Sequence, residues 1–312
     1  MVLKWLIGLG NFSLSFCAIL LNRLIFLPVF RLAFVSRKST IYIIAFFNIL
    51  SDLIQLSITC FHLSASIMAD RYILSNGQLD FWNVLLGGLF INAWYMECLV
   101  QIVMAVNRFT IITLNNKTFF TFTSTMIIFV ILLSVTIFSA ACSQYLFPCC
   151  RYIADHQVMS YMFVFIDGVH SYSNTQLVIY DVICTSTSTL CYMSVFHTIR
   201  KTNKLVPTNA VVNRSNKDVK YLIQFVFISL FYVLAFVLFE ILPHIVPADQ
   251  PEWYAIVPAV IVCNCSSNSI IYLSTNPEVQ GGLPILWIRN KLLVGPVSSS
   301  AAVVNPPINP TN

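Results

Sequence analysis

Long apolar stretches alternate with short polar segments along the chain, and this alternation sets the expected architecture. An α-helix needs about 20 apolar residues to cross the hydrocarbon core of a bilayer. Stretches of that length lie at residues 6–27, 41–63, 81–106, 126–145, 177–197, 221–245 and 253–273. The pattern predicts an all-α fold, a seven-transmembrane helix bundle with short loops.

The composition of the chain agrees with burial in lipid rather than in water. Apolar residues make up 58% of the chain and charged residues only 9%, and the mean hydropathy is +0.80. Soluble domains carry about 25% charged residues, so this chain has too few polar side chains to cover a surface that faces water. We therefore expect an integral membrane protein.

Basic residues are distributed unevenly between the two sets of loops, and this predicts the orientation. Thirteen Lys and Arg residues follow the first, third, fifth and seventh stretches, against three in the other segments, which are Lys4, Arg71 and Arg151. Short loops rich in Lys and Arg stay on the cytoplasmic side. We expect the N-terminus outside and the C-terminus inside. The net charge of +5 then reflects a basic rim beside anionic lipid rather than nucleic-acid binding.

Segments outside the apolar stretches have patterns of their own. Residues 159–166 form a short apolar run that we expect to be a strand over the outer mouth of the bundle. Residues 1–280 are expected to form the seven-helix receptor domain. Residues 281–294 have the pattern of a short amphipathic helix on the membrane surface, and residues 295–312 that of a disordered cytoplasmic tail.

Polar and aromatic residues of the third stretch recur with helical spacing. Phe90, Trp94, Glu97, Gln101 and Arg108 are separated by 4, 3, 4 and 7 residues, which places all five on one face of a helix. Polar side chains in lipid turn toward the interior of a bundle or a water-filled cavity. We expect this face to run along the central axis of the protein.

Two acids lie within apolar stretches, Asp52 in the second and Glu97 in the third. A carboxylate at that depth must be neutralised, paired or bound to a cation, whereas an asparagine can serve as a simple hydrogen-bonded clamp between helices. If both acids point inward, they are neighbours and share a proton or a cation. The polar residues that could partner them are Asn22, Arg23, Asn48, Asn264, Asn268 and Asn276.

Short motifs of the chain resemble those of G-protein-coupled receptors. Asn107-Arg108-Phe109 closes the third stretch as the Asp-Arg-Tyr motif does in that superfamily. Residues 48–52 look like its second-helix motif that ends in Asp, and residues 276–279 look like its Asn-Pro motif at the end of the seventh helix.

The more specific resemblance is to nematode serpentine chemoreceptors of class x (Srx). These receptors similarly carry Asn-Arg-Phe after the third helix and Asn-Pro-Glu after the seventh. Their cysteine-centred outer loop resembles residues 150–155 of this chain. The resemblance extends from Gly8 to Gln280 and implies a rhodopsin-like fold.

The resemblance implies a chemosensory receptor that binds a small, odorant-like extracellular ligand and signals through a heterotrimeric G protein. It also implies a multi-pass protein of the plasma membrane, placed in sensory cilia. An aromatic pocket with few polar anchors suits a mostly apolar ligand, and the candidate lining residues are Phe90, Trp94, Tyr180, Asp181, Glu240 and Tyr254. The candidate residues for contact with the G protein are Asn107, Arg108, Phe109, Arg200 and Lys201. Because many such receptors hold sodium beside the second-helix Asp, the implied buried polar or sodium site comprises Asn22, Asp52, Glu97 and Asn276.

The chain departs from the superfamily pattern in two respects. It has no cysteine near the outer end of the third stretch, so the usual disulfide cannot form there. Cys142, Cys149 and Cys150 remain as candidates that could pair among themselves, in a connectivity that the sequence does not fix. Asn107 replaces the acid before Arg108, so the usual Asp–Arg pair is absent and basal activity could be high.

Other functions are disfavoured by the same residues. The seventh stretch has no lysine, so a retinal Schiff base cannot form there. Phe90 stands where amine receptors hold an acid, which argues against a biogenic amine. No set of His, Cys, Asp or Glu has the sequence spacing of a metal site, and no Gly-rich phosphate loop occurs. We expect no metal centre, no cofactor and no enzymatic activity.

Two alternatives to a signalling receptor stay open at this level. A transporter or ligand-gated ion channel could use Asp52 and Glu97 as an ion path, although no internal repeat is visible and the number of stretches is odd. The other alternative is a receptor-like protein that no longer signals, since several motif positions differ from the superfamily pattern.

Overall fold

The structure is a computed structural model of the 312-residue chain. It describes residues 2–116, 118–166, 168–205, 230–242, 244–247 and 250–283. Most of the expected amphipathic helix at 281–294, the expected tail at 295–312 and the first part of the sixth predicted stretch lie outside these residues.

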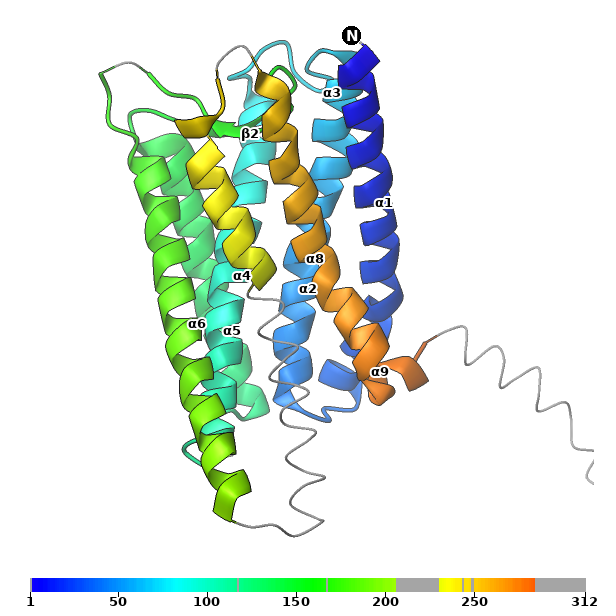
Figure 1. Cartoon of the computed structure of the whole chain (residues 1–312), viewed down its shortest axis with the longest axis vertical. Coiled ribbons are helices and arrows are strands. Elements are labelled where there is room, and N and C mark those ends of the chain that lie inside the picture. The colour runs from blue at the N-terminus through cyan, green and yellow to red at the C-terminus, as the bar shows by residue number, and fades with distance from the viewer. Residues whose placement is uncertain are drawn as a thin grey trace, which may run out of the picture.

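Helices account for most of the described chain (Figure 1). Several extend through π-helical turns, at Arg31–Val35, Thr59–Ser64 and Cys142–Leu146. The helices are α1 (Val2–Phe30), α2 (Thr40–Ile58), α3 (Ala65–Ala69), α4 (Phe81–Ile112), α5 (Phe122–Ala141), α6 (Tyr172–Leu205), the helix Leu230–Leu242, α8 (Ile256–Thr275, preceded by the 3₁₀ turn Pro251–Ala255) and α9 (Pro277–Gly281).

The helices fall where the apolar stretches predicted them. Among the described residues, six are long and apolar enough to cross a membrane, and Leu230–Leu242 is a shorter apolar helix at the position of the sixth predicted stretch. Helices α1, α4 and α6 are longer than the stretches that predicted them; α6 begins at Tyr172 and ends at Leu205, beyond residues 177–197 at both ends.

Side-chain caps fix where several helices begin. Asp80 accepts a hydrogen bond from the amide of Phe81, at 2.6 Å, at the start of α4. Thr121 and Ser124 form a reciprocal capping box at the start of α5. Such caps satisfy amides that have no partner inside the helix, so these polar residues end the loops before the apolar stretches begin.

Helix α4 is the central helix of the bundle and α5 is a peripheral one. In the most apolar window of α4, 72% of the residues are buried, against 22% in α5. Phe90, Trp94, Glu97 and Gln101 are all buried, as expected for an inward-facing stripe. The apolar surface of α5 that remains exposed within the protein is suited to contact with lipid.

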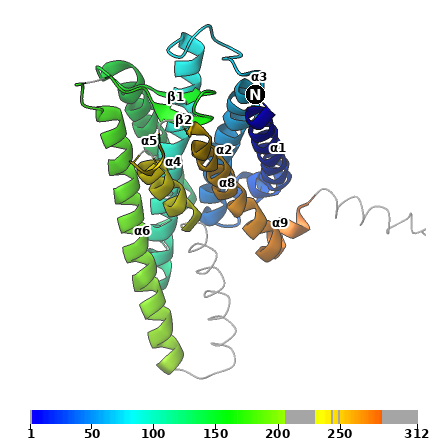
Figure 2. The same cartoon turned by 45° about the horizontal axis from the view of Figure 1, so that its top comes forward.

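A β-hairpin closes the end of the bundle that carries the N-terminus, which we call the outer end (Figure 2). Strands β1 (Tyr152–Asp155) and β2 (Ser160–Phe163) pair antiparallel, with Tyr152 opposite Phe163. The predicted strand at 159–166 is confirmed in β2, but the partner strand β1 was not predicted. At Gly87 of α4, a Cβ atom would lie 2.0 Å from the carbonyl oxygen of Tyr152, so the close approach of the hairpin requires glycine.

Candidate functional site

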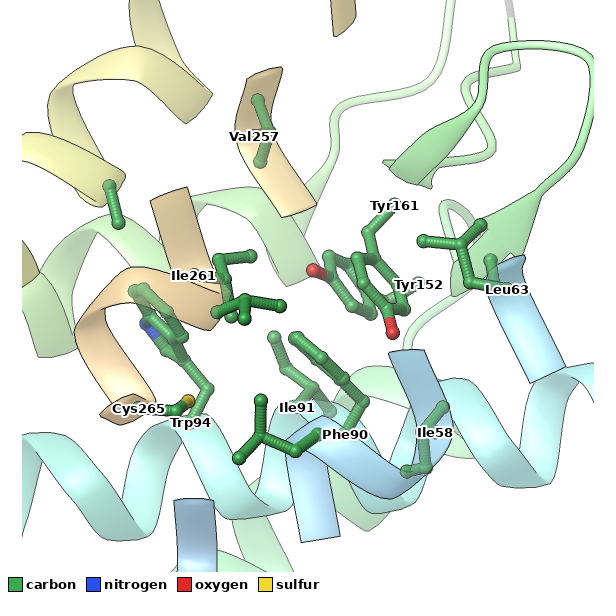
Figure 3. Packing of buried hydrophobic residues seen from close by; sticks show 14 of the residues in the cluster. Ile58, Leu63, Phe90, Ile91, Trp94, Tyr152, Tyr161, Val257, Ile261 and Cys265 are labelled. Atoms are coloured by element: carbon green, nitrogen blue, oxygen red, sulfur yellow. The ribbon is translucent and has the colours of Figure 1, made fainter. Parts of the chain in front are cut away.

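A small cavity of about 10 Å³ lies beneath the hairpin at the outer end of the bundle. Its lining comes from α4, the hairpin, α6, the helix Leu230–Leu242 and α8, and consists of Ile91, Trp94, Tyr152, Leu177, Asp181, Ala235, Phe236, Phe239 and Ile261. Figure 3 shows Ile91, Trp94 and Ile261 packed close together, with the Tyr152 and Tyr161 rings from the hairpin nearby. A volume of this size is about what one water molecule needs.

Asp181 is the acidic residue among the described residues that line this cavity, and its two carboxylate oxygens differ. Oδ1 accepts hydrogen bonds from Trp94 Nε1 at 3.0 Å, from Cys98 Sγ at 3.5 Å and from the hydroxyl of Tyr232. Oδ2 is buried and has no hydrogen-bond partner among the described residues. The three donors therefore hold the carboxylate in place through one oxygen and leave the other without a donor among the described residues.

Two other candidate ligand residues on α4 and α6 are engaged in aromatic packing. The Phe90 ring stacks on Tyr161 of the hairpin with centroids 3.9 Å apart. Tyr180 stacks on Tyr95 at 4.3 Å, and its hydroxyl lies 2.7 Å from Ser139 of α5. Phe90 thus supports the hairpin, and Tyr180 joins α4, α5 and α6.

The remaining candidate ligand residues lie near the outer end. Glu240, on the helix Leu230–Leu242, is half-buried, and its Oε1 is buried without a hydrogen-bond partner among the described residues. Tyr254 is half-buried in the 3₁₀ turn that precedes α8. Trp94 and Asp181 are therefore in direct contact, whereas the other candidates occupy separate positions around them.

A second polar cluster lies deeper in the bundle, where α2, α4 and α8 meet. Oxygen atoms of Asp52 and Glu97 and the sulfur of Cys265 all lie within 4.8 Å of one another, and all three residues are buried. The two acids are therefore neighbours, as predicted. The sequence spacing gave no metal-ligand set, and Cys265 received no role, because these three residues come from three different helices.

Amide side chains surround the two carboxylates. Asn48 and Asn268 each donate to Asp52 Oδ2 at 3.1 Å. Gln55 donates to Glu97 Oε2 at 2.9 Å and Asn264 to Oε1 at 2.5 Å. One oxygen in each of five residues, Asp52 and the four amides, is buried with no hydrogen-bond partner among the described residues; these atoms are Asp52 Oδ1, Asn48 Oδ1, Gln55 Oε1, Asn264 Oδ1 and Asn268 Oδ1.

Other polar residues proposed for this network do not bond the acids. Asn22 joins α1 to α8, since it donates to the carbonyl of Cys265 at 3.0 Å and accepts from Ser269 at 2.8 Å. Asn276 caps α9 and donates to the Tyr42 hydroxyl at 3.2 Å. Arg23 is exposed on α1. Gln55 was not singled out from the sequence, although its position three residues after Asp52 on α2 is compatible with the same helical face.

The candidate signalling residues lie at the opposite, inner end of the bundle. Asn107 is buried, Arg108 and Phe109 are half-buried, and Arg200 and Lys201 are exposed on α6. The guanidinium of Arg200 lies over the ring of Phe196, 4.8 Å from its centroid. Exposure of the basic residues on α6 leaves them accessible to a partner.

Ionic contacts tie neighbouring helices together at both ends. Lys38 Nζ lies 2.8 Å from Glu278 at the inner end, and Lys4 Nζ lies 2.7 Å from Asp70 at the outer end. The hydrogen bond from Lys38 lowers the pKa of the Glu278 carboxyl, helped by a hydrogen bond from Tyr42. The hydrogen bond from Lys4 likewise lowers the pKa of the Asp70 carboxyl.

One disulfide forms among the three candidate cysteines. Cys149 and Cys150, which are adjacent in the sequence and buried, are bonded to each other. Cys142 is a free thiol in the π-helical turn that ends α5. The bond therefore lies within the outer loop and does not join that loop to α4.

Comparison with known proteins agrees with this architecture. The sequence profile of the family described as serpentine type 7TM GPCR chemoreceptor Srx matches residues 12–276. The crystal structure of squid rhodopsin superposes with a TM-score of 0.69 at 11% sequence identity, over 92% of this chain and 86% of that chain. Among curated proteins, none matches the sequence.

These findings confirm the predicted family and the predicted rhodopsin-like bundle of a multi-pass membrane protein. They do not favour the transporter or ion-channel alternative. The chain belongs to the Srx family of serpentine seven-transmembrane chemoreceptors, which are G-protein-coupled receptors.

Proposed function

We propose that this chemoreceptor binds a small extracellular ligand at the cavity beneath the hairpin and signals through a heterotrimeric G protein at its inner end. The observation that carries the proposal is that one buried helix, α4, links the two ends. Trp94 contacts Asp181 in the outer cavity, Glu97 belongs to the central cluster, and Arg108 lies near the inner end of the same helix. Fourteen residues separate Trp94 from Arg108, which corresponds to about 21 Å along a helix.

The proposed ligand pocket comprises the outer cavity and the residues around it. Trp94 and Asp181 form its polar floor, and Phe90, Tyr180, Glu240 and Tyr254 lie around it. A ligand that binds one packing of these helices more tightly than another would shift the population between inactive and active states. Since the cavity holds little more than one water, ligand entry requires the aromatic side chains that line the cavity to move.

The proposed G-protein surface comprises the end of α4 with Asn107, Arg108 and Phe109, and the end of α6 with Arg200 and Lys201. The uneven distribution of basic residues supports an orientation with this end in the cytoplasm. The proposed location is the plasma membrane, in the cilia of a sensory cell, where an outer pocket meets external chemicals.

We also propose that a cation or a shared proton occupies the Asp52–Glu97 cluster in the inactive state. Two carboxylates and a thiol within 4.8 Å cannot all carry charge without compensation. The five oxygens without hydrogen-bond partners are hard ligands of the kind that sodium prefers, and amides can supply them. Asn22 and Asn276 support the neighbouring helices α1, α8 and α9 rather than the cation itself.

The test is nucleotide exchange by a G protein fused to the inner end, in cells that display the receptor at measured surface levels. Arg108→Ala should reduce exchange at least about 10-fold, an effect of roughly 1.4 kcal/mol, because it removes the cation at the centre of the inner surface. Arg71→Ala, which changes an exposed arginine at the outer end, is the matched control. Equal exchange in wild type and Arg108→Ala would remove Arg108 from the signalling surface, and no exchange in wild type with any ligand would indicate a silent receptor.

A further inference from the structure

We propose that the ligand of this receptor is a small organic amine, whose protonated nitrogen is bound by Asp181. The inference rests on the proposed function, since it assigns a ligand class to the same outer cavity. Phe90 occupies the α4 position from which an acid would recognise an amine, but the structure places an acid against the same cavity from α6.

The hydrogen bonding of Asp181 is asymmetric, and the asymmetry points to a ligand. All three donors, from Trp94, Cys98 and Tyr232, bond Oδ1. Oδ2 has none among the described residues, although Asp181 is only 1% exposed and lines the cavity. A buried carboxylate oxygen without a donor costs free energy that a ligand N–H can recover.

The electrostatics of the cavity favour a positive charge. None of the described residues that line it is a lysine or an arginine. A second carboxylate, that of Glu240, acts electrostatically on Asp181, and the group that offsets Glu240 is His244, one helical turn further along. Histidine is charged only when protonated, so the interactions of the two acids with the described residues include at most one cation.

The shape of the cavity favours an amine with an apolar body. A volume of about 10 Å³ accommodates a group close to the size of one water, and an ammonium head meets that limit. Trp94 stacks on Tyr232 with centroids 5.3 Å apart, so a cation at Asp181 would also lie beside aromatic rings that attract it. The apolar part of the ligand would displace Phe239 and Tyr152, which form the apolar side of the cavity.

The test measures binding to the purified full-length receptor by thermal unfolding, without a G protein. The probes are two pairs that differ only in the polar group: 2-phenylethylamine with 2-phenylethanol, and 3-methylbutylamine with 3-methylbutanol. Each amine should stabilise the receptor at a concentration about 10- to 100-fold lower than its alcohol, as expected for a charge-assisted hydrogen bond. Equal effects of amine and alcohol, or no stabilisation by either amine, would overturn the inference.

Variants locate the binding site. Asp181→Asn keeps the shape of the side chain and an oxygen for Trp94 but removes the charge, so the amine should lose its advantage over the alcohol. Asp70→Asn, the same substitution at an exposed outer carboxylate, should leave that advantage unchanged. Phe239→Ala should enlarge the cavity and shift the preference toward amines with bulkier bodies. If Asp181 had only a structural role, this shift in amine preference would not occur. An unchanged amine advantage in Asp181→Asn would also overturn the inference.

The two proposals fail in different ways. Amine binding without nucleotide exchange would support the ligand assignment and contradict G-protein signalling. Nucleotide exchange triggered by the alcohols and not by the amines would support signalling and overturn the amine assignment.

Discussion

The two buried acidic sites of the bundle surround their carboxylates with different chemistry. At the outer cavity, Asp181 is held by an indole, a thiol and a phenol, all on one oxygen. At the central cluster, Asp52 and Glu97 are held by side-chain amides. A side-chain amide that donates an N–H also carries an acceptor oxygen, whereas indole brings a donor only.

This difference separates two roles for a buried acid. The central cluster retains five oxygens without a hydrogen-bond partner in the described part of the chain, which suits a small cation or a proton that holds helices together. Among the described residues that line the outer cavity, Asp181 Oδ2 is the carboxylate oxygen without a hydrogen-bond partner, and the cavity walls are aromatic, which suits the charged end of an organic molecule. Which donors surround a carboxylate thus indicates what it can bind.

The largest expected effect tests whether a disturbed hairpin weakens the outer site while the rest of the bundle still forms. Gly87→Val would drive a side chain into the Tyr152 carbonyl, which a Cβ atom would already approach to 2.0 Å. Such overpacking costs about 1–3 kcal/mol or more, and ligand potency should fall at least about 10-fold. Gly10→Val, where a Cβ meets no heavy atom within 4 Å, is the control, with surface level and dose–response as the measurements. Equal behaviour of the two variants would show that the hairpin contact is dispensable.

The next effect tests whether the central cluster holds a cation. Asp52→Asn should alter basal signalling and remove the sodium dependence of ligand potency, which we expect to be about 5-fold or more in wild type, as for other coupled sites. Ligand affinity in sodium-free buffer should stay near the wild-type value, because the outer site is intact. Dose–response curves with and without sodium, with Asp70→Asn as the control, make the comparison. If wild type shows no sodium or pH dependence and Asp52→Asn signals normally, the cluster is only a hydrogen-bonded clamp.

A smaller effect sharpens the role of the donors at Asp181. Tyr232→Phe removes a hydroxyl that bonds Asp181 and lies 2.8 Å from Cys98 Sγ. The unfolding free energy should fall by about 1 kcal/mol, and the amine probes should bind more tightly, because the carboxylate then has one internal donor fewer on Oδ1. Thermal unfolding without the probes measures the change in stability, and thermal unfolding with the probes measures the change in amine binding. Tyr145→Phe, at an exposed tyrosine, should change neither, and a matching shift there would point to a general effect of losing a hydroxyl.

The smallest effect concerns the outer salt bridge and its pH dependence. The pKa of Asp70 is lowered by the hydrogen bond from Lys4, so its contribution to stability is fully present above the ordinary pKa of Asp, about 3.9. It is lost as the pH falls through the lower folded-state pKa. Asp70 is largely exposed, and such pairs contribute at most about 1 kcal/mol. The unfolding temperature of Asp70→Asn should therefore be slightly lower than that of wild type at pH 7 and equal to it near pH 2. A larger difference in unfolding temperature at low pH than at pH 7 would contradict this prediction.

Much of the fold could be predicted from the sequence, because each helix must satisfy the bilayer separately. The helix positions follow from apolar length alone. The inward face of α4 followed from the spacing of Phe90, Trp94, Glu97 and Gln101, all of which are buried. The neighbouring positions of Asp52 and Glu97 followed from the cost of leaving either acid in lipid.

Apart from the proximity of Asp52 and Glu97, the contacts between helices could not be predicted, because no periodicity within one helix specifies its neighbour's rotation. Cys265 lies close to Asp52 although 213 positions separate them in the sequence, and Trp94 donates a hydrogen bond to Asp181, which is 87 positions away. The pairing of β1 with β2 was missed, since Tyr152–Asp155 is recognised as a strand only through the register with Ser160–Phe163.

The sequence by itself determined that this protein crosses the membrane, that its helices form a receptor bundle of the Srx family and that acids lie in its interior. These properties depend on length, spacing and solvent, which act on each segment alone. Only the tertiary structure decided that Asp181 faces Trp94 beneath a hairpin and that Cys265 joins the two central acids. Those contacts depend on how the helices rotate and pack against one another, and packing is a property of the whole bundle.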